Sequence, residues 1–202
     1  YDQTHVVKIG ASYDLPVGRR RQFASGMPMW ADFVGGGWTL QYIGNYASGM
    51  PVGFGATGTP NSNFATNRPF LINPTGASLY NSSFDQSKFD MTDISVVHAG
   101  KTYFNTSMVV NPTTINRYAR GNAPRIVSQL RGFASYNEDV SLQKNFVPKE
   151  GFRIQFRAEF LNLFDRHRLT GFNTNPASPL FGQITGVSNS PRKIQFGIRA
   201  DF

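Results

Sequence analysis

Residues 152–164, FRIQFRAEFLNLF, and residues 193–202, KIQFGIRADF, decide the fold, because apolar and polar side chains alternate along both segments. In the first segment Phe156 and Phe160 alternate with Arg157 and Glu159. Successive side chains of a β-strand point to opposite faces, so a period of two is typical of a strand. Both segments are therefore predicted to be strands with one apolar face and one polar, charged face.

The alternation alone does not distinguish a soluble sheet from a membrane barrel, since a half-buried strand of a soluble protein has the same period. Each segment, however, has the ~9 to 11 residues that a tilted strand needs to cross a bilayer. Aromatic residues stand at the segment ends, where a barrel has its interfacial girdle. The chain itself ends on an aromatic residue, Phe202. These features favour an all-β fold of antiparallel transmembrane β-barrel strands.

The same alternation predicts further strands over residues 4–15, 37–48 and 133–146. Residues 16–37 are expected to be a connection, and residues 49–130 a long extracellular loop rich in Asn, Ser, Thr, Gly and Pro. Short apolar runs at 94–97 and 107–110 could form strand extensions or a small hairpin. Glu138 and Lys144 interrupt the apolar face of the strand at 133–146. Because a basic group costs roughly 2 to 4 kcal/mol at the bilayer midplane and little at an interface, we expect both side chains to snorkel from the strand ends.

Composition supports an all-β chain and excludes several functions. The 202 residues include 18 Phe, 20 Gly and 12 Pro, which indicates many strands and turns and little helix. No cysteine is present, so disulfides and thiolate sites are excluded. No unbroken apolar run reaches the ~18 residues of a transmembrane helix. The net charge of +8 is scattered, apart from Arg19 to Arg21, and without a recognition helix no nucleic-acid partner is predicted.

Nothing in the sequence predicts an enzyme. The three histidines, His5, His98 and His167, lack metal-ligand spacing and lie in no nucleophile motif. The acidic run Asp85, Asp90, Asp93 departs from the calcium-loop pattern and is read as an ordinary acidic loop. We therefore predict no catalytic residue, no metal and no cofactor.

Several blocks together resemble the barrel of TonB-dependent outer-membrane receptors, in particular the Oar-like group. They span nearly the whole chain, in the family's order, and are HVVKIGASYDLPVGRRR, GGWTLQYIGNYASGMPV, GNAPR, NEDVSLQKNF, FRAEFLNLFDRHRL, FGQI and SPRKIQFGIRADF. The resemblance implies a wall segment of a bacterial outer-membrane transporter for energy-coupled uptake of a solute. About five strands cannot close a barrel, which needs about eight or more. The chain is thus expected to be the carboxy-terminal part of a barrel of about 22 strands.

The fold and the resemblance assign roles to three sets of residues. The lipid-facing aromatic girdle is predicted to contain Tyr13, Trp38, Tyr42, Tyr46, Phe146, Phe152, Phe156, Phe160 and Phe196. The lumen-facing charges are predicted to be Lys8, Arg153, Arg157, Glu159, Lys193 and Arg199. The resemblance implies an assembly signal for the barrel insertion machinery, made of Phe196, Ile198 and Phe202. Ligand-binding residues are not identified.

The resemblance also implies partners: outer-membrane lipids and lipopolysaccharide, the remaining strands and plug of a parent chain, and the TonB complex, reached through that plug. The alternative is a soluble β-sandwich or adhesin-like binding module that uses the 49–130 loop for recognition. Such a sandwich would enclose Phe156, Phe160, Phe196 and Ile198 in a core, whereas a barrel places them against lipid.

Overall fold

The chain folds into two compact units in the computed structural model, which describes residues 2–55, 69–71, 78–86, 102–111, 114 and 121–202. We call the first the sheet unit, residues 5–47, 135–167 and 189–202. The second, the loop unit, contains residues 1–4, 48–134 and 168–188. Each unit is described by itself.

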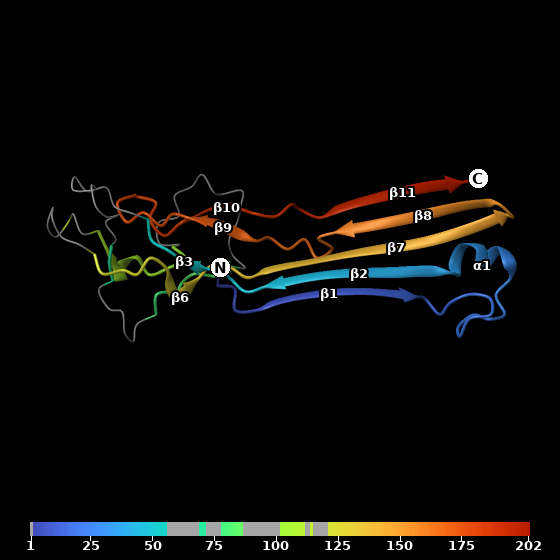
Figure 1. Ribbon diagram of the computed structural model, residues 1–202, viewed down its shortest axis with the longest axis horizontal. Helices are drawn as coiled ribbons and strands as arrows, with labels where there is room; N and C mark the ends of the chain where they lie inside the picture. The colour runs from blue at the N-terminus through green and yellow to red at the C-terminus, as the bar shows by residue number, and fades with distance from the viewer. Residues whose placement is uncertain (1, 56–68, 72–77, 87–101, 112–113, 115–120) are drawn as a thin grey trace. The chain divides into compact units, whose positions relative to one another are not determined.

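The sheet unit is one antiparallel five-stranded sheet with the order β1-β2-β7-β8-β11 (Figure 1). Its strands are β1 (Val6–Asp14), β2 (Trp38–Ala47), β7 (Ser135–Lys149), β8 (Phe152–Leu161) and β11 (Lys193–Asp201). The prediction of an antiparallel, almost wholly β architecture is confirmed. Every connection between neighbouring strands reverses the chain direction, so the sheet is a meander whose loops leave from its two ends.

Two strand ends differ from the sequence prediction for local reasons. The strand expected to end at 164 ends at Leu161, because Asn162 adopts a left-handed backbone with φ of 51°. The Asn162 side chain then donates to the carbonyls of Arg166 and Ser190, both at 3.0 Å. The strand expected to end at 146 continues to Lys149 and is closed by a two-residue turn in which Gly151 has a φ of 81°.

The connection between β1 and β2 contains a short helix that was not predicted, α1 (Met29–Gly35). Pro28 precedes it with extended backbone, and the Gly36 N–H closes its last turn on the Asp32 carbonyl at 2.9 Å. Pro before a segment and glycines after it are ordinary helix boundary signals. No helix among the described residues has the length and apolar character needed to span a membrane.

Among its described residues the loop unit contains three small antiparallel pairs, two of them made mostly by the predicted 49–130 loop. The pairs are β3 (Pro51–Val52) with β6 (Val127–Arg131), β4 (Phe70–Leu71) with β5 (Val109–Val110), and β9 (Leu169–Phe172) with β10 (Ile184–Val187). The 107–110 run falls on β5 and the 3₁₀ turn Thr106–Met108 before it. The 94–97 run lies outside the described residues.

An aromatic core holds the loop unit together. Phe104 and Leu130 are almost fully buried, at 1% and 0% exposure. The Tyr103 ring lies 4.5 Å from that of Phe133 and 4.7 Å from that of Phe172, between centroids. Its hydroxyl donates to the Arg131 carbonyl at 2.5 Å. The loops thus have an apolar core of their own.

Alkaline pH should destabilise the loop unit through Tyr103. Burial raises the pKa of this hydroxyl above its ordinary value of 10.0, and the neighbouring Tyr80 raises it further. Up to pH 10.0 the Tyr103 hydroxyl is protonated in the folded and in the unfolded chain, so its contribution to the free energy of unfolding is intact. Above it the unfolded chain ionises first, so the free energy of unfolding falls until pH passes the folded pKa.

The predicted alkaline loss of stability can be checked by measuring how well the loop unit resists protease between pH 8 and pH 12. The gene product is embedded in a membrane for this assay. Tyr103→Phe should weaken the unit at neutral pH by about 0.5 to 1.5 kcal/mol, the usual value of one hydrogen bond. It should also flatten the alkaline loss, whereas Tyr13→Phe, at an exposed position of β1, should leave that loss unchanged. An identical alkaline profile for Tyr103→Phe and wild type contradicts the assignment.

Candidate functional site: the two faces of the sheet

The strand register collects the apolar side chains on one face. A single transverse row crosses all five strands, in the order Ala11, Tyr42, Val140, Phe160 and Ile194. Residues directly opposite each other in an antiparallel pair project to the same face. Because successive residues alternate, this row fixes the face of every other residue in the regular parts of the sheet.

All nine residues predicted for the aromatic girdle belong to this apolar face by register or alternation: Tyr13, Trp38, Tyr42, Tyr46, Phe146, Phe152, Phe156, Phe160 and Phe196. Ring contacts link strands of this face, across β7 between β2 and β8 and directly between β8 and β11. The Trp38 ring meets Phe156 edge-on at 6.0 Å, and Phe156 stacks with Phe196 at 6.3 Å. Phe196 and Ile198 remain 70% and 76% exposed on β11. An apolar surface this open is suited to lipid rather than water.

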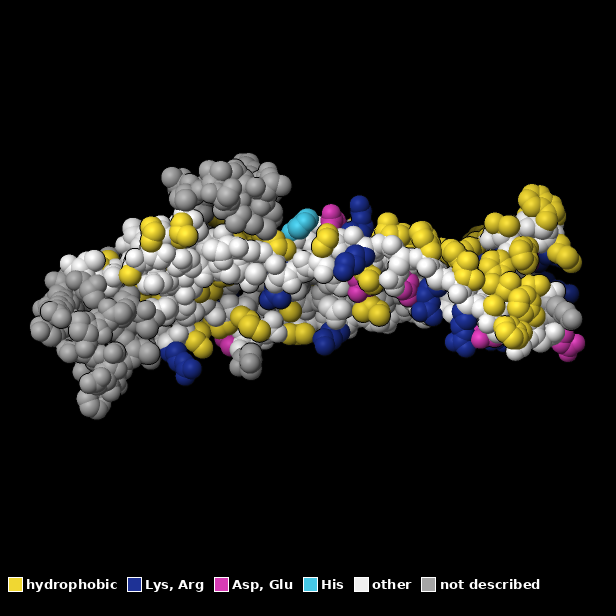
Figure 2. All heavy atoms as spheres, turned by 90° about the horizontal axis from the view of Figure 1, so that it is seen from above, with side chains coloured by type: hydrophobic (Ala, Val, Ile, Leu, Met, Phe, Trp, Pro, Cys, Tyr) yellow, Lys and Arg dark blue, Asp and Glu magenta, His cyan; other side chains and the backbone are white. Residues whose placement is uncertain are grey.

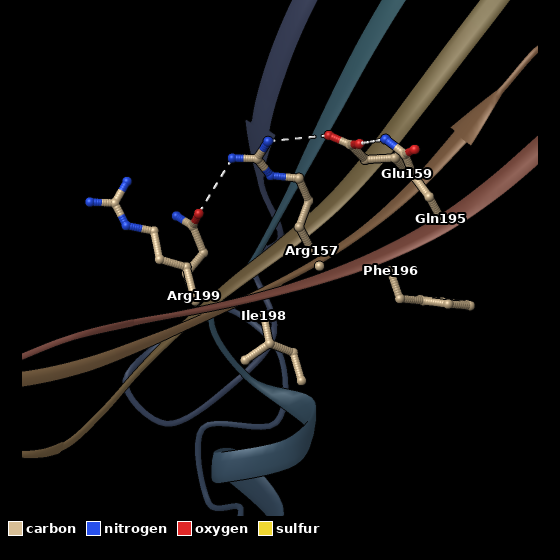
Figure 3. Close-up of a pocket in the computed structure, with 8 residues that line it drawn as sticks. Arg157, Glu159, Gln195, Phe196, Ile198 and Arg199 are labelled. Atoms are coloured by element: carbon tan, nitrogen blue, oxygen red, sulfur yellow. Dashed lines mark hydrogen bonds and ion pairs between the residues drawn. The ribbon is translucent and has the colours of Figure 1, made fainter.

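The opposite face carries the polar network (Figure 3). Arg157 donates through its two terminal nitrogens to Glu159 at 3.2 Å and to Gln155 at 3.3 Å, and Gln195 of β11 donates to Glu159. Figure 3 shows Arg157, Glu159 and Gln195 on one side of the sheet and Phe196 and Ile198 on the other. A groove across β8 and β11 is lined by the polar side chains of Gln155, Arg157, Glu159, Gln195 and Arg199 and also by Phe196, Gly197 and Ile198.

The six charges predicted to face the lumen all fall on this polar face: Lys8, Arg153, Arg157, Glu159, Lys193 and Arg199. The structure brings Arg157 and Glu159 into one ion pair. Arg199 pairs with Asp201 at 2.8 Å on the same strand, and Lys8 lies on β1, three strands away from β8. Asp14, Asp139 and Asp201 lie on the same face by register, so its cations and carboxylates are nearly balanced, and the face as a whole is polar and charged.

Glu138, the first charge that interrupts the apolar face, is only 2% exposed and has a partner from outside its strand. Arg166, in the turn after β8, donates through Nε to its carboxylate at 2.9 Å. The guanidinium also lies 5.6 Å from the Tyr136 ring centroid and 5.4 Å from that of Phe164. The charge is therefore compensated in place.

Space for the buried carboxylate comes from Gly44, which lies directly opposite Glu138 on β2. The hydroxyls of Tyr42 and Tyr46 form a hydrogen bond on the same face. A Cβ atom at position 44 would lie 2.7 Å from the Tyr42 hydroxyl, so a side chain there would force the two tyrosines apart.

Lys144, the second interruption, is 4% exposed beneath the connection that holds α1. Its Nζ donates to the Asp32 carbonyl at 3.2 Å and to the Gly36 carbonyl. It also lies 5.0 Å from the Phe146 ring centroid and 5.6 Å from that of Trp38. Carbonyls at a helix C-terminus carry partial negative charge and suit a cation.

The expectation that both charges snorkel is therefore wrong, because each is buried against a dedicated partner. Sequence reasoning missed these partners, Arg166 and α1. No sequence signal marks Arg166, which is one of several cations in the turn after β8. For α1 a signal exists: Trp30, Phe33 and Val34 have helical i, i+3, i+4 spacing between Pro28 and three glycines.

The described residues contain no group of three or more His, Asp or Glu side chains placed to hold a metal ion. The site is thus a sheet with an apolar and a polar face, the arrangement of a transmembrane barrel wall. A family model described as outer membrane beta barrel domain matches residues 1–195. The chain belongs to this family, and its location is the bacterial outer membrane. Neither the curated proteins nor the solved structures gave a match.

Removing Arg166 should destabilise the sheet unit, because it leaves the buried Glu138 carboxylate without its counter-ion. We expect Arg166→Gln to cost roughly 1 to 3 kcal/mol, the range for an unsatisfied buried group. Adding Glu138→Gln should recover most of the loss, since the charge that needs compensation is gone. Urea titration of the gene product refolded in liposomes, followed by heat-modifiable mobility in gels, measures both.

The matched control is Arg199→Gln, which removes an exposed pair on the other face and should cost at most about 1 kcal/mol. Equal stability of Arg166→Gln and the control would show that Glu138 does not need Arg166.

Proposed function

We propose that the chain is a wall segment of a TonB-dependent receptor that takes up a solute with energy supplied by the TonB complex. Membership of the outer-membrane barrel family supports the general statement that the chain is a barrel wall in the outer membrane. The proposal of TonB-dependent uptake rests on the sequence blocks that resemble TonB-dependent receptors. The single observation that carries it is the groove of polar and charged side chains opposite a continuous apolar face.

Further strands should flank this sheet. Strands β1 and β11 each have one hydrogen-bonded neighbour in the described sheet. Unpaired backbone groups are costly in hydrocarbon, so both edges need partners there. This favours a larger barrel, such as the predicted wall of about 22 strands, which encloses a plugged lumen. We propose no catalytic role for the chain.

Connection lengths support an orientation. The β7–β8 turn has two residues, whereas the connections that leave the other end of the sheet contain the long segments 48–134 and 162–192. Outer-membrane barrels have short periplasmic turns and longer extracellular loops. The β1–β2 connection, residues 15–37, leaves the same end as the β7–β8 turn and is longer than this rule prefers. We assign the end with α1 to the periplasm and the loop unit to the cell surface, where it would meet solute and lipopolysaccharide.

The last strand supports a role in assembly. β11 presents Ile194, Phe196 and Ile198 as exposed side chains, and Phe202 is fully exposed after it. The resemblance to TonB-dependent receptors implies that the barrel insertion machinery reads this segment. We therefore keep Phe196, Ile198 and Phe202 as the proposed assembly signal.

Neighbouring positions on β11 offer a direct test of the two faces, since the chain has no cysteine of its own. Gln195→Cys should react with a membrane-impermeant maleimide in intact outer membranes, because its side chain lies on the polar face. Phe196→Cys should react only with a lipid-soluble maleimide. The two positions are adjacent, so each serves as the other's control. Equal reaction of both with the impermeant reagent would favour the soluble binding module.

Uptake can be tested separately with radiolabelled iron chelates, oligosaccharides and peptides in cells with and without the gene. Gene-dependent accumulation should stop when a protonophore removes the energy source. Replacing Arg157 and Arg199 by Gln should lower it several-fold at unchanged surface amount, because the groove loses its cations, whereas Lys8→Gln should have a smaller effect. Accumulation that persists with the protonophore would indicate a passive pore.

A further inference from the structure

The side chains of α1 form an exposed apolar patch at one end of the sheet unit. Met29, Trp30, Phe33 and Val34 are each more than half exposed. Figure 2 shows hydrophobic side chains gathered at its right-hand end, where α1 and the β7–β8 turn lie in Figure 1. A helix of this kind needs an apolar environment for these side chains.

Two contacts fix α1 on the apolar face of the sheet, which is the lipid side of a barrel wall. The Phe33 ring packs on Phe146 of β7 at 4.9 Å. Lys144, on the same face, holds the carbonyls of Asp32 and Gly36 at the end of the helix. The patch therefore continues the lipid-facing surface instead of lying under the lumen.

A hollow beside the helix combines positive charge with apolar walls. It lies between the β1–β2 connection and the end of β7. Its charged lining residues are Arg19, Arg21, Lys144 and one carboxylate, Asp32, and Phe33 and Phe146 are among its apolar ones. The Asp32 carboxylate accepts the Arg19 backbone N–H at 2.7 Å, which ties the arginine-bearing loop to the helix. The Arg19 and Arg21 side chains themselves are exposed.

We propose that this element anchors the protein in the membrane interface, with Arg19 and Arg21 binding the phosphate of an anionic phospholipid. The apolar side chains of α1 lie among the upper parts of the acyl chains, as in interfacial amphipathic helices. Guanidinium groups suit phosphate because they donate two parallel hydrogen bonds. The lipid is identified by continuity with the lipid-facing sheet and by its charge. Only the choice of the periplasmic leaflet rests on the proposed orientation.

Lipid binding is tested on the whole gene product by native mass spectrometry with phosphatidylglycerol added in detergent. Replacing both Arg19 and Arg21 by Gln should lower the fraction with bound phosphatidylglycerol several-fold. The control, Arg153→Gln with Arg199→Gln, removes two charges from the polar face and should keep that fraction. Equal retention of the lipid in both double variants would overturn the headgroup site, because Arg19 and Arg21 would then not bind it. Equal loss would also overturn it, because binding would then depend only on net charge.

Insertion of α1 is tested by a nitroxide label at Trp30→Cys in phosphatidylethanolamine–phosphatidylglycerol vesicles. The label should be more accessible to oxygen than to a water-soluble nickel chelate, whereas a label at Glu150→Cys in the β7–β8 turn should show the reverse. Preferential access of the nickel chelate to position 30 overturns the anchor. Neither readout measures transport, so a failed uptake assay and a failed anchor are distinguishable.

Discussion

The sheet unit depends on the register of its strands, because the apolar face is suited to lipid and the polar face to water. A strand that slips by one residue exchanges every side chain between the faces. For β8 such a slip would turn Arg157, in the middle of the strand, toward lipid, at roughly 2 to 4 kcal/mol for a cation near the bilayer midplane. The row from Ala11 to Ile194 and the polar network around Arg157 select the same register from opposite sides of the sheet.

Glu138 and Lys144, the two charges on the apolar face, fit this constraint because each has a partner in a connecting segment outside the strands. Arg166 reaches Glu138 from the turn after β8, and the carbonyls at the end of α1 reach Lys144. Each contact also ties that segment to the middle strand of the sheet, β7. A hydrophobic residue at either position would avoid the desolvation cost but would lose this link. Glu138 and Lys144 therefore hold the turn after β8 and the segment with α1 in position.

Period-two alternation was sufficient to predict the antiparallel sheet and the face of each girdle residue, since side-chain direction in a strand follows from sequence order alone. It was not sufficient for the strand ends, which depend on the left-handed backbone of Asn162 and on the turn at Gly151. The partners of Glu138 and Lys144 also escaped prediction, because Arg166 is 28 residues and Asp32 is 112 residues away in sequence. Alternation carries no information about such distant pairs. The core around Tyr103 likewise joins segments that have no common period.

The separate core of the loop unit bears on how far the two units can vary independently in sequence. Phe104, Leu130 and the rings around Tyr103 stabilise the loop unit with contacts made inside it. The sheet unit is held by its own ladders and by the ion pair of Glu138. Because the contacts that hold each unit lie inside it, substitutions in the loop-unit core should leave the register of the sheet intact. A wall constrained by lipid on one side can then remain fixed while the segments that would meet the solute vary.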